Sequence, residues 1–180
     1  VGAERNDGNN GSYSGHVRIF EWDGNSWNQL GADIDGEAAN DNSGYSVSLS
    51  NNGNTVAIGA YNNNGNGAGS GHVRIFEWDG INWNQLGQDI DGEAAWDQSG
   101  RSVSLSDNGN TVAIGSYRSN GQAGHVRVFS FSNPCLDLGC LDPLALNYDP
   151  NATVSDSTCV YPLYGCIDNA AFNYNVSANI

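Results

Sequence analysis

Apolar and polar residues alternate along short stretches of this chain. In residues 16–22, Val17 and Ile19 lie on one face of an extended strand, and Phe20 and Trp22 lie on the other. A strand with apolar side chains on both faces is stable only when both faces are covered. We therefore expect a sheet that is packed between two neighbouring sheets.

The same pattern recurs along the chain. The ten residues 15–24 return unchanged as residues 71–80, and a shorter form returns as residues 124–129, so that one copy follows another after roughly 55 residues. Each repeat contains four short runs of β-branched and aromatic residues, separated by Asp-Gly, Asn-Gly or longer Gly/Asn turns. Four antiparallel strands per repeat are predicted.

Four strands per unit at this spacing predict an all-β fold built of β-propeller blades. A closed propeller needs about 4–8 blades, whereas residues 1–132 contain about two and a half. The sequence begins inside one repeat, and the array of repeats ends near residue 132 after a single strand of another. We expect a partial β-propeller whose remaining blades belong to the same polypeptide.

Three short motifs support this interpretation. Residues 43–47, 58–60 and 71–76 resemble the FG-GAP repeat of integrin-α-like β-propellers, and a second copy runs from residue 99 to residue 129. The resemblance implies blades of an extracellular binding or adhesion protein. The acidic calcium loop of many such repeats is replaced here by residues 50–54 and 106–110, which we interpret as Asn-Gly hairpin turns.

A second region is predicted at residues 133–180, where all four cysteines lie. Residues 139–159 resemble a short cysteine repeat, Gly-Cys-Thr-Asp followed by Ala-x-Asn-Tyr, that occurs in tandem in secreted bacterial proteins. A second copy starts at Gly165 and stops before its closing cysteine. We expect a small disulfide-rich loop domain, in which this copy is truncated.

The cysteines indicate an oxidising, extracellular setting. Pairing neighbours, Cys135 with Cys140 and Cys159 with Cys166, leaves no cysteine unpaired and is favoured. The rival pairing joins Cys140 to Cys159 within one copy. Zinc at these cysteines is not expected, because no Cys-x-x-Cys or nearby histidine accompanies them.

Two kinds of loop concentrate oxygen ligands that suit Ca²⁺. Loops of the propeller region gather four carboxylates around a glycine: Asp33, Asp35, Glu37 and Asp41 in one repeat, and Asp89, Asp91, Glu93 and Asp97 in the next. The cysteine-rich loop carries Asp142, Asn147, Asp149, Asn151 and Asp156. Calcium is the one cofactor predicted, and the alternatives are solvated blade edges and Asx turns without metal.

Tryptophans flank the Asp-Gly turns as pairs, Trp22 with Trp27 and Trp78 with Trp83. We expect cross-strand aromatic packing within each pair. A glycan-stacking platform is the alternative, and it also includes Trp96, which the earlier repeat replaces with Asn40.

The composition of the chain excludes several classes of function. The chain has 20 acidic and 6 basic residues, and its net charge of −14 argues against a nucleic-acid partner. No apolar run is long enough to span a membrane, and no catalytic or phosphate-binding motif is present. We expect a secreted or cell-surface binding and adhesion module that contacts an extracellular protein or glycan. The alternatives are a carbohydrate-binding lectin and a non-catalytic part of a secreted enzyme.

Overall fold

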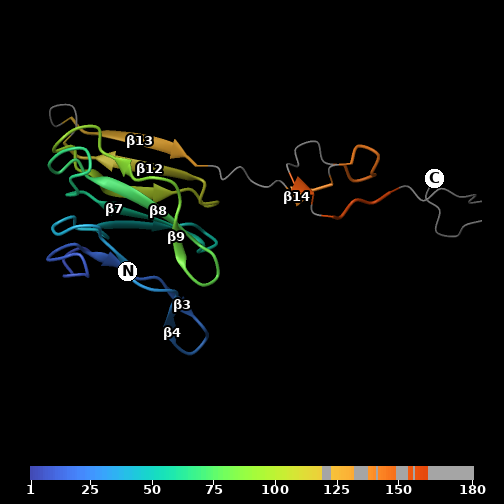
Figure 1. The fold of residues 1–180 in the computed structure, drawn as a ribbon, viewed down its shortest axis with the longest axis horizontal. Helices are drawn as coiled ribbons and strands as arrows, with labels where there is room; N and C mark the ends of the chain where they lie inside the picture. Colours follow the sequence, from blue (N-terminus) through green and yellow to red (C-terminus); the bar gives the residue numbers. More distant parts are fainter. Residues whose placement is uncertain (119–122, 132–137, 141, 149–153, 156, 162–180) are drawn as a thin grey trace, which may run out of the picture. The chain divides into compact units, whose positions relative to one another are not determined.

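The computed structural model describes residues 1–118, 123–131, 138–140, 142–148, 154–155 and 157–161 (Figure 1). The chain divides into two compact units, Val1–Phe131 and Ser132–Ile180. The boundary falls beside the one predicted after residue 132. Each unit is described by itself.

The described residues of the first unit form strands and turns and no helix, as predicted. Its strands are β1 (Gly2–Ala3), β2 (His16–Val17), β3 (Phe20–Trp22), β4 (Trp27–Gln29), β5 (Ile34–Asp35), β6 (Ser46–Leu49), β7 (Thr55–Ala60), β8 (His72–Trp78), β9 (Trp83–Gln85), β10 (Ile90–Asp91), β11 (Ser99–Leu105), β12 (Thr111–Ser116) and β13 (His125–Ser130).

The middle blade is the most complete sheet of the described chain. It runs in the order β6, β7, β8, and both β9 and β10 pair with β8. All of these pairings are antiparallel. The strands β9 and β10 together make the fourth strand of the blade in two pieces, so the predicted four-stranded unit is confirmed.

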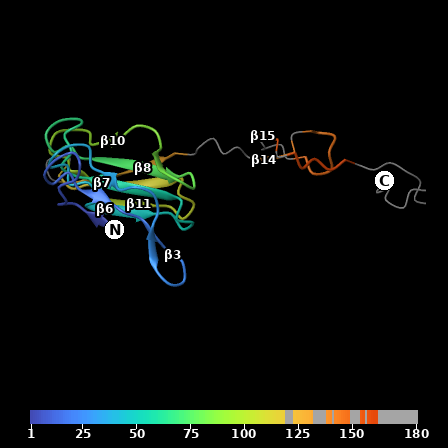
Figure 2. The same ribbon diagram turned by 60° about the horizontal axis from the view of Figure 1, so that its bottom comes forward.

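The blades on either side are less complete versions of the same sheet. In the first blade, β1 pairs with β2, β2 pairs with β5, and β3 and β4 form a hairpin. The third blade has the order β11, β12, β13. The repeated segment thus forms β2 with β3 in one blade, β8 in the next and β13 in the last, and the three blades follow one another through the unit (Figures 1 and 2).

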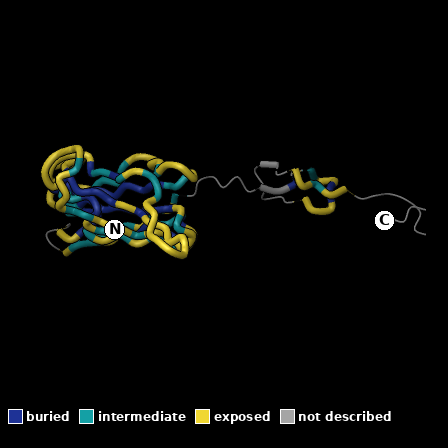
Figure 3. Tube along the Cα trace, turned by 90° about the horizontal axis from the view of Figure 1, so that it is seen from below, coloured by how far each residue is buried: buried dark blue, intermediate teal, exposed yellow. Residues whose placement is uncertain are grey.

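Apolar layers fill the two junctions between the blades. The first layer joins Val17, Ile19 and Ile34 of the first blade to Val56, Ile58 and Phe76 of the middle blade. The second joins Ala57, Val73 and Ile75 of the middle blade to Val112 and Ile114 of the third. Burying each large aliphatic side chain contributes about 1.5–3 kcal/mol. The middle blade is covered on both faces, as its pattern predicts. Figure 3 shows buried segments running through the interior of the first unit.

The predicted Asn-Gly hairpin turns are confirmed. Between β6 and β7, the Ser50 hydroxyl donates to Asn52 Oδ1 at 2.8 Å and accepts from the Thr55 amide at 3.0 Å. Gly53 has a φ of 76°, a left-handed conformation that favours glycine. The turn at residues 106–110 repeats these bonds through Ser106, Asn108 and Thr111. The side chains of the serine and of the asparagine before the glycine are thus used within both turns.

In the second unit, β14 (Leu138–Gly139) pairs in parallel with β15 (Val154–Ser155). A disulfide joins Cys140 to Cys159. The described turns of this unit lie around that bond.

The backbones of the middle and third blades approach closely at Gly59 in β7. A Cβ on Gly59 would lie 2.1 Å from the backbone oxygen of Gly100, which cannot move without shifting the third blade. The equivalent Gly115 in β12 meets only the Ser102 side chain at 2.3 Å, and a hydroxyl can rotate away.

We predict that Gly59→Ala destabilises the protein by about 1–3 kcal/mol, because overpacking forces the two blades apart. Gly115→Ala, the matched control, is expected to change stability by less than about 1 kcal/mol. Urea denaturation followed by tryptophan fluorescence measures both. Equal midpoints for the two variants would contradict the close approach.

Candidate functional site

The repeated arginine of each blade reaches into the acidic loop of the blade before it. Arg74 Nη2 donates to the backbone oxygen of Asp35 at 2.6 Å, and its Nη1 lies 3.7 Å from Glu37 Oε1. Arg127 makes the same pair of contacts, to the Asp91 oxygen and to Glu93. Both arginines therefore tie neighbouring blades together at the edge of the apolar layers.

The first blade uses its arginine differently. Arg18 pairs with Asp33 of its own blade, with Nη2 2.7 Å from Oδ2, and Gln29 also donates to Asp33. The hydrogen bond from Arg18 is the largest of the effects that lower the pKa of Asp33 to about 2. Asp33 is thus a satisfied carboxylate, held within one blade.

A histidine faces two carboxylates at the first junction. His72 Nδ1 lies 3.3 Å from Asp89 Oδ2 in its own blade and 3.8 Å from Glu37 Oε2 in the preceding blade. The side chain is 1% exposed, and this burial lowers the pKa of His72. Burial is also the main cause that raises the pKa of Glu37, to which the adjacent Asp89 adds. Burial therefore favours the uncharged imidazole of His72.

The four carboxylates of one acidic loop do not converge on one point. Asp33 and Asp35 group with His16, whereas Glu37 groups with His72 and Asp89 across the junction. Asp41 is buried and accepts hydrogen bonds from the Ala38 amide and from Asn63. The calcium ligands predicted within one loop are therefore split between separate clusters, and calcium itself stays a prediction.

The second loop divides in the same way. Asp89 also accepts from Gln85, and Glu93 reaches His125 and Arg127 of the next blade. Asp97 is buried and accepts from the Ala94 amide at 2.9 Å. In Asp91, the backbone oxygen accepts from Arg127. In both loops the glutamate, Glu37 or Glu93, thus contacts the histidine and the arginine of the next blade.

The predicted tryptophan pairs are confirmed as cross-strand neighbours. Trp22 lies opposite Trp27 and Trp78 opposite Trp83, with ring centroids 5.4 and 5.3 Å apart. The second pair packs into the first junction, where Trp83 Nε1 donates to the Leu30 oxygen at 3.0 Å. This pair therefore packs within a junction, and a glycan-stacking role for it stays a prediction.

The other tryptophans are open to solvent. Trp22 is 51% exposed, Trp27 67% and Trp96 59%. Trp27 also lines an apolar hollow of about 490 Å³ together with Phe20 and Val47. The indole rings of Trp22, Trp27 and Trp96 are therefore accessible to a ligand in the described structure.

A cluster of one arginine and three tyrosines spans the middle and third blades. The Arg101 guanidinium lies 5.4 Å from the ring of Tyr45, 5.3 Å from Tyr61 and 4.8 Å from Tyr117. Arg101 also donates weakly to Gln98, at 3.4 Å. Among the described residues no carboxylate lies within ion-pair distance of it. We call these four residues the tyrosine–arginine cluster.

A hollow adjoins this cluster. It has a volume of about 290 Å³ and is lined by Arg101, Ser102, Gly115, Ser116, Tyr117 and His125. A guanidinium carries five N–H donors, so Arg101 retains donors for a ligand there. Sequence reasoning missed the cluster, although one signal was present: Arg101 replaces the Tyr45 of the preceding repeat.

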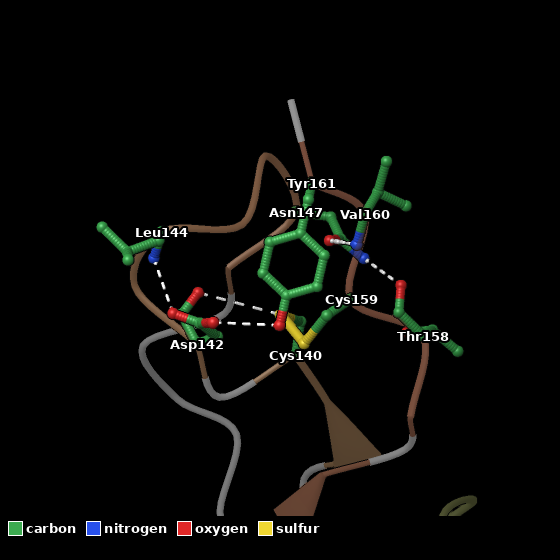
Figure 4. The surroundings of a disulfide bond; sticks show 8 residues. All are labelled: Cys140, Asp142, Leu144, Asn147, Thr158, Cys159, Val160 and Tyr161. Atoms are coloured by element: carbon green, nitrogen blue, oxygen red, sulfur yellow. Dashed lines mark hydrogen bonds between the residues drawn. A yellow bond between two sulfur atoms is a disulfide. The ribbon is translucent and has the colours of Figure 1, made fainter. Parts of the chain in front are cut away.

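The second unit corrects the favoured cysteine pairing. The disulfide joins Cys140 to Cys159, so the neighbour pairing of Cys135 with Cys140 and of Cys159 with Cys166 is wrong (Figure 4). Cys135 and Cys166 lie outside the described residues. The bond joins two cysteines that are 19 residues apart, a pairing that sequence spacing alone does not decide.

The described calcium candidates of this unit make hydrogen bonds to other residues of the unit. Asp142 accepts from the Leu144 amide and from the Tyr161 hydroxyl, both at 2.9 Å. Asn147 donates to the Thr158 oxygen and accepts from the Val160 amide (Figure 4). Asp149, Asn151 and Asp156 lie outside the described residues. The Asp142–Leu144 contact matches the Asx-turn alternative, whereas Asn147 joins its own segment to residues 158–160.

The Asp-Gly turns contain a carboxylate whose titration can be followed. Asp23 accepts from the amides of Ser26 and Asn25, both at 2.7 Å, and from the Asn28 side chain. These hydrogen bonds lower the pKa of Asp23 from 3.8 to about 2, with the Ser26 amide contributing most. Asp79 in the next repeat makes equivalent bonds, which lower its pKa as well.

Because the folded-state pKa of Asp23 is depressed, its stabilising effect is present above pH 3.8 and is lost as the pH falls through about 2. Asp23→Asn is expected to make the decline of the melting temperature over that range shallower. Glu21→Gln, which removes a carboxyl from β3, is the control. Carboxyl NMR titration provides the direct measurement, and a midpoint for Asp23 near 3.8 would contradict the hydrogen-bond account.

Comparison with known proteins finds a match within the first unit. No curated protein matches the chain. The family model described as FG-GAP repeat matches residues 32–76, from the acidic loop of the first blade to Phe76 in β8 of the middle blade. This part of the chain is similar to an FG-GAP repeat, as its motifs predict.

Proposed function

We propose that this chain is a binding or adhesion module of a secreted or cell-surface protein and that it is not itself a catalyst. FG-GAP repeats are typically extracellular binding and adhesion modules, and one matches residues 32–76. A disulfide in the second unit agrees with an oxidising compartment. Among the described residues no helix has the length and hydropathy needed to cross a membrane.

The observation that carries the proposal is the tyrosine–arginine cluster. Tyr45 and Tyr117 are exposed, and the Arg101 guanidinium lies within 5.4 Å of both rings and lines the hollow. Tyrosine and arginine are enriched among residues that dominate binding energy at interfaces. A guanidinium also forms strong, directional hydrogen bonds to carboxylates and sulfates. The partner best suited to this surface presents an acidic group on an extracellular protein or glycan.

The overall charge restricts which acidic partners can bind. A net charge of −14 repels strongly anionic polymers at long range. Recognition at Arg101 must therefore depend on short-range contacts with a single acidic group. Calcium bound by acidic loops would reduce this repulsion, and calcium remains part of the proposal as a cofactor.

A second candidate function is carbohydrate binding at the first blade. Trp22 and Trp27 are both more than half exposed, and Trp27 lines the apolar hollow. Exposed indole rings stack on the apolar faces of sugars. This site would accept neutral glycans, which distinguishes it from the tyrosine–arginine cluster. A non-catalytic role within a larger secreted enzyme is compatible with either surface.

An array of neutral glycans, acidic glycans and extracellular-matrix proteins tests the proposal with the full chain. We expect binding to acid-bearing ligands, weakened about tenfold or more by Arg101→Gln, since a hydrogen bond to a charged group contributes about 1.5–3 kcal/mol. Arg5→Gln makes the same charge change at an exposed position and is the control.

The other outcomes are informative as well. Retained acidic-ligand binding by Arg101→Gln would contradict the cluster as the site. Binding to neutral glycans that Trp27→Ala abolishes would favour the second candidate. No binding to any arrayed ligand would contradict both. Circular dichroism checks that each variant keeps the β fold.

A further inference from the structure

We propose that the junction between the first and middle blades binds a zinc ion through Glu37, His72 and Asp89. These residues come from two blades: Glu37 follows β5, whereas His72 begins β8 and Asp89 precedes β10. The site would be a metal clamp between blades, and it is separate from the binding surface proposed above.

The ligand atoms lie close to the spacing that a zinc site requires. One ligand atom from each residue lies within 4.8 Å of the other two. His72 Nδ1 is 3.3 Å from Asp89 Oδ2 and 3.8 Å from Glu37 Oε2. In a tetrahedron with bonds of 2.0–2.2 Å, ligand atoms are separated by about 3.3–3.6 Å. Small side-chain rotations are enough to close the site on a cation.

A buried nitrogen that forms no hydrogen bond points to a ligand at this position. His72 is 1% exposed, and its Nδ1 forms no hydrogen bond within the described structure. A buried polar atom without a partner is costly, and native structures usually satisfy it. The same nitrogen faces two carboxylate oxygens, so a cation among the three atoms would satisfy all of them.

Charge also favours a cation here. Glu37 and Asp89 approach each other at the junction, and Arg74 lies 3.7 Å from Glu37 on the side of Oε1. One arginine cannot neutralise two carboxylates. A divalent ion beside Oε2 would offset the remaining repulsion without displacing Arg74.

The equivalent histidines lack this arrangement. His16 faces Asp33 and Asp35, but Arg18 and Gln29 already donate to Asp33, and Asn9 donates to Asp35. His125 lies 3.7 Å from Glu93, and no further carboxylate joins that pair in a cluster of the described residues. His72 is therefore distinguished by two carboxylates, one from each side of a junction.

The ligand types favour zinc over calcium. Calcium takes oxygen ligands in sites of six to eight, whereas zinc accepts imidazole and carboxylate in sites of four. Three protein ligands would leave the fourth position to water. Because both blades supply ligands, the ion would bind the folded state and stabilise the junction.

Isothermal titration calorimetry with zinc chloride and chelator-treated full chain tests the site, and Co²⁺ substitution reports its geometry through visible absorption. We expect one tight zinc per chain and a melting temperature about 5–10 °C higher at a zinc concentration one hundred times Kd. Glu37→Gln and His72→Gln should weaken zinc binding at least tenfold. The matched controls His16→Gln and His125→Gln should retain it.

Each remaining outcome counts against the proposal. No stoichiometric zinc binding, or full binding by Glu37→Gln, would overturn it. Loss of binding in His16→Gln with retention in His72→Gln would place the metal elsewhere. A rise in melting temperature with calcium but not with zinc would overturn the choice of metal. Glu37 is half exposed, so its variant remains informative if His72→Gln fails to fold.

Discussion

The structure depends on the middle blade being covered on both faces by its neighbouring blades. Along β7, Val56 and Ile58 face the first blade and Ala57 faces the third, so that a single strand contributes to both apolar layers. No blade of this kind can bury both faces alone, because each face needs a neighbour. Most of the stabilising apolar contact therefore lies at the junctions between blades. A blade at the edge of the array exposes apolar side chains that an inner blade buries. The tryptophan pairs illustrate this difference: Trp83 packs into a junction, whereas Trp27 on the first blade is exposed.

Polar side chains at the rim of each junction also connect one blade to the next. Arg74 and Arg127 donate to backbone oxygens of the preceding blade. These hydrogen bonds hold neighbouring blades at the distance at which the apolar layers pack. At Gly59 the backbones are close enough to exclude even a methyl group. The cluster of Glu37, His72 and Asp89 lies at the same boundary, where two blades together place ligands that neither could supply alone.

Much of the fold could be predicted because it is periodic. Alternation in residues 16–22 predicted two apolar faces, and near-identical repeats predicted equivalent strands, which β8 and β13 confirm. The interruption between β2 and β3 could not be predicted, since the sequence there is the same as in continuous β8. The interruption follows from strand pairing, because β2 has only two paired residues in β1, whereas β8 has six in β7.

Contacts between repeats were harder to predict than contacts within them. The sequence places Glu37 beside Asp35, but only the stacking of blades brings it to His72. The disulfide partner of Cys140 likewise depends on loop geometry and not on spacing. Arg101 could have been found from its departure from the repeat, because a residue that breaks periodicity is not needed by the common fold.

Amide hydrogen exchange measured strand by strand tests the central claim most directly. If stability belongs to the junctions, the amides of β7 and β8 are protected most, and those of β1, β3 and β4 exchange fastest, because opening the middle blade breaks two apolar layers while opening an edge blade breaks one. Equal protection across the three blades, or greater protection in β3 and β4 than in β7, would contradict the account.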